Sequence, residues 1–162
     1  MPNYRRWRQS GGSYFFTLAL ADRSQSLLLD HIALLRDAFA TVQQRYPFRM
    51  DATVILPEHL HCIWTLPVSD IDYSTRWRQI KSMFSRGIKA NESRSPSRIR
   101  KKERGIWQRR FWEHMLRDEN DMNQHIDYIH FNPVKHGYVN RPVDWQHSSL
   151  HRFIENGILT PD

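Results

Sequence analysis

The sequence contains a single cysteine, Cys62, among its 162 residues. One thiol cannot form an internal disulfide, and it excludes the cysteine-rich kind of zinc site. No apolar run approaches the roughly 20 residues of a membrane span, and the first residues, MPNYRRWRQSGGSYFF, lack the apolar core of a secretory signal. We therefore expect a cytoplasmic protein in a reducing setting, without a membrane partner.

The length and composition are those of one globular unit. A chain of 162 residues with 40% hydrophobic and 12% aromatic residues can bury one proper core. We expect a single domain over residues 1–162, with a C-terminal tail from about residue 138. The stretch NESRSPSRIRKKERG, residues 91–105, has few apolar residues and much serine and charge, so it predicts a flexible basic loop.

Acidic residues are scarce in the middle of the chain. Between Tyr73 and Arg117 there are 14 lysines and arginines against 3 acids, whereas the rest of the chain has 10 against 14. Together these give the formal net charge of +7, and the excess is concentrated in one region. A concentrated positive charge favours a phosphate-tracking surface. The plainer alternative is a solvated charged face beside a disordered basic loop.

Apolar patterns order the secondary structure. They predict strands over 13–20, 50–57, 59–66 and within 106–116, and helices over 26–45, 74–90 and 119–131. The last helix is expected to end or kink at Asn132, because Pro133 disfavours helical geometry there. The order strand-helix-strand-strand-helix-strand-helix predicts an α+β domain, a ferredoxin-like antiparallel sheet with helices mainly on one face.

Two histidines, His59 and His61, flank one leucine in the apolar stretch LPEHLHCIW. In a strand, residues i and i+2 point to the same face, so the two imidazoles can converge on one metal ion. Burying a polar group costs free energy unless it is ligated or hydrogen-bonded, which favours a metal site here. Two surface or partly satisfied histidines that alternate with core residues are the alternative.

A candidate for the rest of such a site lies in HIDYIHFNP, residues 125–133. Tyr128 and Asn132 are four residues apart, so they lie on one face of a helix, next to Gln124 and His125. Taken singly, Tyr128 could be a core or cap residue and Asn132 a helix-end residue. A phenol and an amide that arrive together opposite two imidazoles favour metal-assisted chemistry.

These residues resemble the HUH single-tyrosine transposases, and specifically the REP-associated tyrosine transposases of bacteria. The resemblance rests on the His-Leu-His triplet at 59–61 and on FWEHMLRDENDMNQHIDYIHFNPVKHGYV at 111–139. It extends from the segments YRRW and GGSYFFT near the start to the region of Trp145 and Ser148. The basic loop looks like an insertion relative to shorter members.

The resemblance implies a fold, a site and a reaction. His59 and His61 would bind a divalent metal with Asn132 as the third ligand, and Tyr128 would attack single-stranded DNA. The product would be a 5′-phosphotyrosine, whose reversal rejoins strands. The resemblance implies Mg²⁺ or Mn²⁺, whereas two imidazoles and one oxygen by themselves suit Mn²⁺ or Zn²⁺ better. No residue stands out as the general base, and the candidates are Glu58, His125 and Lys135.

The implied substrate is a DNA hairpin of the repetitive extragenic palindrome (REP) type with an adjacent single-stranded element. Basic residues interleaved with aromatics suit backbone pairing and base stacking on single strands. The expected DNA-binding residues are Arg5, Arg6, Trp7, Arg8, Arg76, Arg78, Lys81, Arg109 and Arg110. On the helix over 74–90 we expect Arg76, Lys81 and Arg86 to face outward. Core packing is the alternative for Trp77 and Trp112.

Two other functions stay open. One is a domesticated hairpin-DNA-binding protein that has lost cleavage, and the other is a metal-dependent hydrolase that uses water in place of Tyr128. Relatives of the insertion-sequence type are domain-swapped dimers and REP-associated members act as monomers, so we expect a monomer and keep a homodimer as the alternative.

Overall fold

Four strands form one antiparallel sheet in the order β2-β3-β1-β4. This computed structural model describes residues 8–89 and 92–161. The strands are β1 (Ser13–Ala19), β2 (Arg49–Ile55), β3 (His59–Thr65) and β4 (Trp112–Met115). Three of them lie within the stretches that the apolar pattern predicts, and β2 begins one residue before its predicted start at Met50. The predicted α+β class is confirmed.

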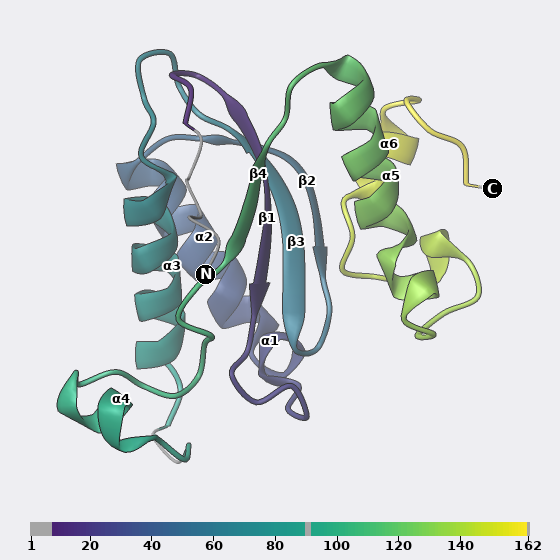
Figure 1. Cartoon of the computed structure of the whole chain (residues 1–162). Coiled ribbons are helices and arrows are strands. Elements are labelled where there is room, and N and C mark those ends of the chain that lie inside the picture. Colours follow the sequence, from purple (N-terminus) through teal and green to yellow (C-terminus); the bar gives the residue numbers. More distant parts are fainter. Residues whose placement is uncertain (1–7, 90–91, 162) are drawn as a thin grey trace, which may run out of the picture.

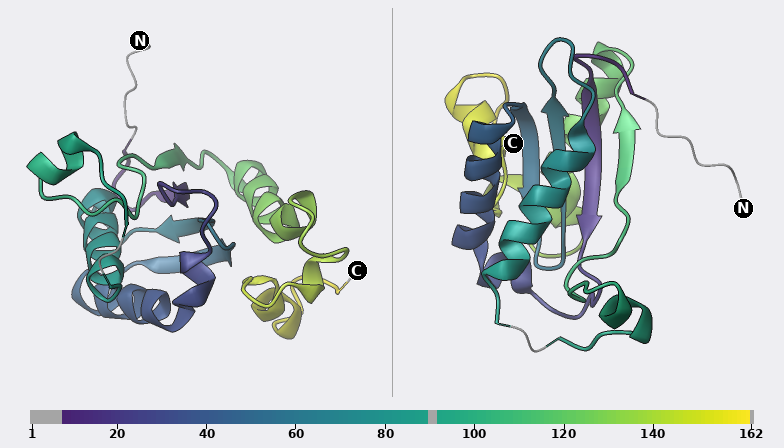
Figure 2. Two further views of the ribbon diagram at one scale, coloured as in Figure 1. Left: turned by 90° about the horizontal axis from the view of Figure 1, so that it is seen from below. Right: turned by 90° about the vertical axis from the view of Figure 1, so that its left-hand side faces the viewer.

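Helices lie on both faces of the sheet (Figures 1 and 2). On one face are α1 (Leu27–Asp30), α2 (Ile32–Arg45) and α3 (Tyr73–Arg86). On the other lie α5 (Glu119–Lys135), the 3-10 turn η1 (Pro142–Asp144) and α6 (Leu150–Glu155). The expectation that helices lie mainly on one face fits α1 to α3, but α5 and α6 make the sheet the middle of three layers.

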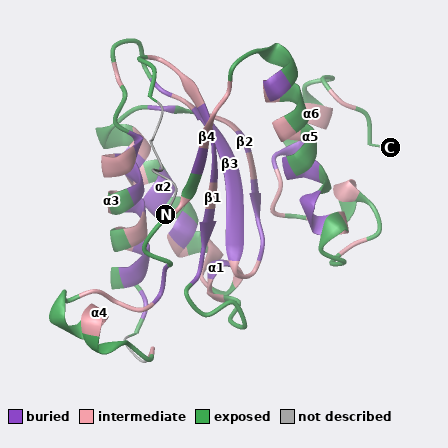
Figure 3. Ribbon diagram, viewed as in Figure 1, coloured by how far each residue is buried: buried purple, intermediate pink, exposed green. Residues whose placement is uncertain are grey.

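Strand alternation divides the buried residues between these two faces. Tyr14, Phe16 and Leu18 of β1 join the larger core with α2 and α3, whereas Phe15 joins a smaller core with Ile129 of α5. The central strands β1 and β3 are almost wholly buried as a result, whereas the edge strands β2 and β4 are more exposed (Figure 3). A polar side chain on the α5 face of a central strand therefore faces a helix and not open water.

Two helix boundaries differ from the sequence prediction. The helix expected over 26–45 is interrupted at His31, which separates α1 from α2. The helix expected to end near residue 131 continues through Pro133 to Lys135. Proline removes only its own N–H, and the backbone resumes helical bonding with His136 N–H to Asn132 C=O at 3.1 Å. The extra turn lengthens α5 beyond Pro133 as far as Lys135.

The segment expected to be a flexible basic loop contains a short helix, α4 (Pro96–Arg100), capped by the Ser95 side chain. Arg104 pairs with Glu92 and donates to the carbonyls of Ser85 (2.6 Å) and Ile88 (3.1 Å) at the end of α3. These bonds fix the described part of this segment to α3. α4 lies at the far end of the molecule from α5 (Figure 1).

Within residues 8–89 and 92–161, no helix is long and apolar enough to cross a bilayer. Cys62 is a buried free thiol in the larger core.

Candidate active site

His59 and His61 lie side by side on the α5 face of β3. Their ring centroids are 5.0 Å apart, and the residues are 3% and 4% exposed. The register pairs His61 with Thr17 and His59 with Ala19 of β1, so both histidines are in the interior of the sheet and not at its edge. Both imidazoles are therefore buried from solvent on the same face of the sheet. The alternative of two solvent-exposed histidines does not apply.

Each imidazole is held through its Nδ1 atom. His59 Nδ1 lies 2.7 Å from a Glu58 carboxylate oxygen, and Arg23 donates to the same carboxylate at 2.8 Å. His61 Nδ1 lies 2.8 Å from the Thr17 hydroxyl. Since Nδ1 is engaged, Nε2 is the nitrogen that remains for a metal, and the outer partners fix the ring orientation.

Both imidazoles are kept neutral. Burial lowers the pKa of His59, although the hydrogen bond to Glu58 opposes the shift. Burial is the main cause that lowers the pKa of His61 to about 3, and electrostatic interaction with the ionisable groups of His59, His136 and Lys135 adds to the shift. A neutral imidazole is the form that binds a metal.

One face of α5 covers the pair. Tyr128, Asn132 and His136 follow one another at intervals of four residues and therefore lie along a single helix face. The Tyr128 ring is 5.3 Å from the His61 ring, and the His136 ring is 5.1 Å from the His59 ring. Asn132, one turn from each, lies between these two contacts.

The Asn132 side chain has an unusual environment. It is 0% exposed, and neither its Oδ1 nor its Nδ2 has a hydrogen-bond partner in the described part of the chain. A buried amide without partners costs about 1–3 kcal/mol. A divalent metal bound beside the two neutral imidazoles would supply a partner for the amide oxygen of Asn132, which lies on the helix face that covers them.

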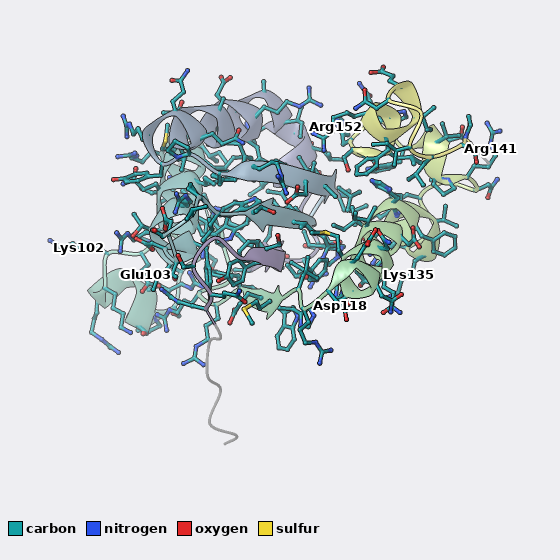
Figure 4. The ribbon with its side chains drawn as sticks, turned by 90° about the horizontal axis from the view of Figure 1, so that it is seen from above. Lys102, Glu103, Asp118, Lys135, Arg141 and Arg152 are labelled. Carbon is teal, nitrogen blue, oxygen red and sulfur yellow. The ribbon has the colours of Figure 1, made fainter. Side chains whose placement is uncertain are left out.

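Tyr128 combines contact with the site and access from outside. Its side chain packs against Phe15 and His61, yet the residue is 37% exposed. Lys135 Nζ lies 3.4 Å from the phenolic oxygen. A pocket opens beside the ring, lined by Phe15, Thr17, Trp112, Gln124, His125 and Tyr128. Figure 4 labels Lys135 at the end of α5 and Asp118 at its start.

Sequence reasoning did not select His136 or Thr17. His136 is eight residues after Tyr128 and so shares its face, but the prediction that the helix ended near residue 131 concealed it. Thr17 reaches His61 only through the pairing of β1 with β3, which the sequence does not display. The sequence offers Glu58 as one candidate for the general base. In the structure its carboxylate lies within hydrogen-bond distance of His59 Nδ1.

The expected DNA-binding residues divide into several groups. Arg5, Arg6 and Trp7 lie outside the described residues. Arg8, Arg78, Arg109 and Arg110 are exposed, although Arg8 donates to Ser74 and Arg109 pairs with Glu103. Lys81 is partly buried, with Nζ 3.1 Å from the Gln108 carbonyl oxygen, and burial lowers its pKa. Of the other two residues expected to face outward, Arg86 is exposed and Arg76 is not.

The expectation that Arg76 faces outward is wrong. Arg76 is 2% exposed, and its guanidinium pairs with Asp70 at 2.9 Å. It also donates to the backbone carbonyls of Tyr46, Pro47 and Asp72. A helical pattern in the sequence shows which residues share a helix face. It does not show that the loops around Pro47 and Asp70 cover Arg76.

The two tryptophans have different environments. Trp77 is fully buried and stacks on Trp64 with ring centroids 4.2 Å apart, so it belongs to the core. Trp112 is 56% exposed and lines the pocket beside Tyr128. Only the second offers a ring face to a ligand.

Comparisons with known proteins give a consistent result. No family model matches the chain. A REP-associated tyrosine transposase of Escherichia coli K12 is 43% identical over 164 residues, covering 100% of the chain and 90% of the relative. A Haemophilus influenzae Rd protein, provisionally given the same name, is 46% identical over 164 residues, covering 100% and 93%. A solved structure of a REP-associated tyrosine transposase bound to a REP hairpin matches with a TM-score of 0.88 and 42% identity, covering 100% and 90%.

Proposed function

Because the chain belongs to the REP-associated tyrosine transposases, we propose that it is a metal-dependent enzyme that cleaves and rejoins single-stranded DNA beside REP-type hairpins. One observation carries the proposal: Tyr128 and Asn132 lie on the helix face that packs against His59 and His61 within the same chain. Burial of two neutral imidazoles and an unpartnered amide beside a phenol does not by itself stabilise the fold, because burying a polar group without a partner costs free energy.

The proposed metal site consists of His59, His61 and Asn132. A divalent ion such as Mg²⁺ or Mn²⁺, held there with open positions, would act as a Lewis acid on the scissile phosphate. The chain's own contribution is to present two neutral, oriented imidazoles and a desolvated amide. Glu58 and Thr17 orient the rings, so we assign them positioning roles.

Tyr128 is the proposed nucleophile. Its phenolic oxygen forms a bond to phosphorus while the bond from phosphorus to the 3′-oxygen breaks, which gives a 5′-phosphotyrosine and a free 3′-hydroxyl. The proton lost by the phenol balances the proton gained by the 3′-oxygen, so the reverse reaction rejoins strands without an energy source. Lys135, 3.4 Å from the phenolic oxygen, stabilises the negative charge that develops on it.

The pocket beside Tyr128 suits a nucleobase next to the scissile phosphate. The exposed Trp112 ring supplies a stacking surface, and Gln124 supplies an amide at the same pocket. Arg78, Arg109 and Arg110 give positive charge on the exposed surface between α3 and β4. The relative bound to a REP hairpin supports the hairpin part of the proposed substrate.

The test uses an end-labelled REP hairpin with a single-stranded flank, Mn²⁺ and the full chain. We expect wild type to form a covalent protein–DNA adduct and Tyr128→Phe to form none. His59→Ala/His61→Ala should also form none, while Tyr138→Phe, a neighbouring exposed tyrosine, should behave as wild type.

Three results would contradict the proposal. An adduct at wild-type levels with Tyr128→Phe removes the nucleophile assignment. Cleavage without an adduct in that variant indicates a hydrolase that uses water. Hairpin binding without cleavage under any divalent metal indicates a binding protein that has lost catalysis.

A further inference from the structure

A second group of metal-ligand side chains lies outside the proposed catalytic site. His114 comes from β4, and Asp121 and His125 come from the first half of α5. One ligand atom from each residue lies within 4.8 Å of the other two. We propose that these three residues bind a second divalent cation of the Zn²⁺ type, separate from the ion at His59 and His61.

The distances suit a shared ion. His114 Nε2 lies 2.9 Å from Asp121 Oδ2, and His125 Nδ1 lies 3.2 Å from Asp121 Oδ1. Tetrahedral ligands at about 2.0 Å from zinc lie about 3.3 Å from one another. The two rings stack at 4.8 Å with an interplanar angle of 21°, so they approach the carboxylate side by side. The three ligand atoms lie within 4.8 Å of one another, so side-chain rotation is needed to bring all of them to the spacing that one ion requires.

The residue types select the class of ion. Two imidazoles and one carboxylate form a borderline ligand set that Zn²⁺ and its neighbours favour, unlike the all-oxygen sets of Mg²⁺ or Ca²⁺. Asp121 and His125 are four residues apart, which places both on one helix face. A fourth position remains for water.

The local charge is compatible with a cation. Burial by itself would raise the pKa of the Asp121 carboxyl, but hydrogen bonds from the Arg117 backbone N–H and the His114 ring hold it below its ordinary value. The carboxylate is therefore available as an anion. The Arg117 side chain is the opposing charge, with Nε 3.8 Å from Asp121 Oδ2, but it is 76% exposed and can turn away.

A hydrogen-bonded cluster is the alternative use of the same residues. In that case His125 Nδ1 donates to the Asp121 backbone carbonyl, from which it lies 2.8 Å, and the His114 ring donates to the carboxylate. Metal binding replaces both ring protons and gives up the bond to the carbonyl. Ring accessibility allows it, since the His114 and His125 side chains are 28% and 25% exposed.

The two metal sites are distinct but adjacent. The Phe15 ring lies between them, 5.4 Å from the His61 ring and 4.8 Å from the His125 ring. An ion at the second site would tie β4 to α5 one turn before Tyr128. It would thus fix the helix that carries the nucleophile without taking part in the proposed reaction.

The test uses calorimetric titration of Zn²⁺ into chelator-treated His59→Ala/His61→Ala protein without DNA. We expect one equivalent to bind, and His114→Gln in that background to weaken binding by more than about tenfold, the loss that even outer-shell changes produce. The matched control, His147→Gln/His151→Gln in the same background, should keep the affinity. Cleavage is not measured, so this result is independent of the proposed function.

Ring NMR signals provide a second readout that needs no further substitution. In His59→Ala/His61→Ala protein, Zn²⁺ should shift the signals of His114 and His125 together, at one equivalent. No binding by this protein, or equal affinity with and without His114, would overturn the proposal. So would shifts confined to other histidines.

Discussion

At the scale of single residues, the clearest sign of function is a group that lowers stability. Asn132 is fully buried, and its amide has no hydrogen-bond partner among the described residues. An unpaired buried amide lowers the free energy of unfolding, so its presence points to another role, such as binding an ion. A bound metal would offset that cost here.

This cost leads to a prediction for Asn132→Leu. Leucine has the same branching but no polar atoms, so the metal-free protein should gain about 1–2 kcal/mol in unfolding free energy. The same variant should form no DNA adduct. Urea denaturation in chelator and the adduct assay measure the two effects.

Asn132→Asp is the control for that change. It keeps an oxygen ligand but buries a charge, so it should be less stable than wild type in chelator and regain stability with Mn²⁺. A leucine variant that is less stable than wild type in chelator would show that the amide has partners in solution.

His130 leads to a prediction about acid. It is buried between α5 and α6, with Nε2 2.9 Å from Ser149 Oγ, and burial lowers its pKa to about 4. Between pH about 6.5 and 4 the unfolded chain binds the proton that the folded protein excludes, so stability falls as pH falls. The loss from this residue is roughly 3 kcal/mol.

Unfolding free energy measured in chelator across this pH range tests the assignment. His130→Gln, which can keep the bond to Ser149, should show a shallower pH dependence than wild type. Parallel curves for the two proteins would contradict it.

Residue-level patterns predict some of the site but not all of it. The alternation around Leu60 shows that His59 and His61 share a face, because strand geometry is local. The four-residue interval links Tyr128 with Asn132 for a similar reason. Thr17 and Glu58 as ring partners depend on strand register and rotamers, which no local pattern contains.

At the scale of elements, α5 is the element that organises the site. Its apolar residue Ile129 packs on the sheet, which presents Tyr128, Asn132 and His136 to the histidines. The sequence predicts the helix and its functional face. It does not predict the turn after Pro133, because the local preference of that proline favours a helix end there, whereas in the structure the residue is buried inside the helix.

The start of α3 offers a paired prediction. Arg76 and Arg78 are two residues apart, but the first is buried in a network of carbonyls and a carboxylate, and the second is exposed. Arg76→Ala should cost about 3–5 kcal/mol of unfolding free energy, because it removes the charge partner of Asp70 and the side-chain donor to three carbonyls.

Arg78→Ala is the matched variant. It should change stability by less than about 0.5 kcal/mol and reduce the salt dependence of hairpin binding by about one phosphate contact. Denaturation and binding titrations at several salt concentrations separate the two roles. Equal stability losses in both variants would contradict the distinction.

At the scale of the whole molecule, apolar patterns predict where the strands lie, and the order of strands and helices predicts the antiparallel class. The sequence does not show that α5 and α6 cover the second face, since the smaller core there is assembled from residues distant in sequence: Phe15, Ala52, Val54, Ile63 and Ile129. The proposed active site lies between this second layer and the sheet.

The arrangement of that layer bears on oligomeric state. The Tyr128 and His61 rings are 5.3 Å apart within one chain, so one chain contains the complete proposed site. Mixing Tyr128→Phe with His59→Ala/His61→Ala should therefore restore no adduct. Recovery of adduct in the mixture would show that partners exchange α5 in a dimer.

The most direct test of the central claim is to locate the DNA–protein bond. After reaction with the REP hairpin substrate, the adduct is digested and the nucleotide-bearing peptide is sequenced by mass spectrometry. The chain has six tyrosines. Among those within residues 8–89 and 92–161, Tyr46 and Tyr138 are exposed besides Tyr128. We predict that the phosphodiester is on Tyr128 alone; a bond to any other residue would contradict the account.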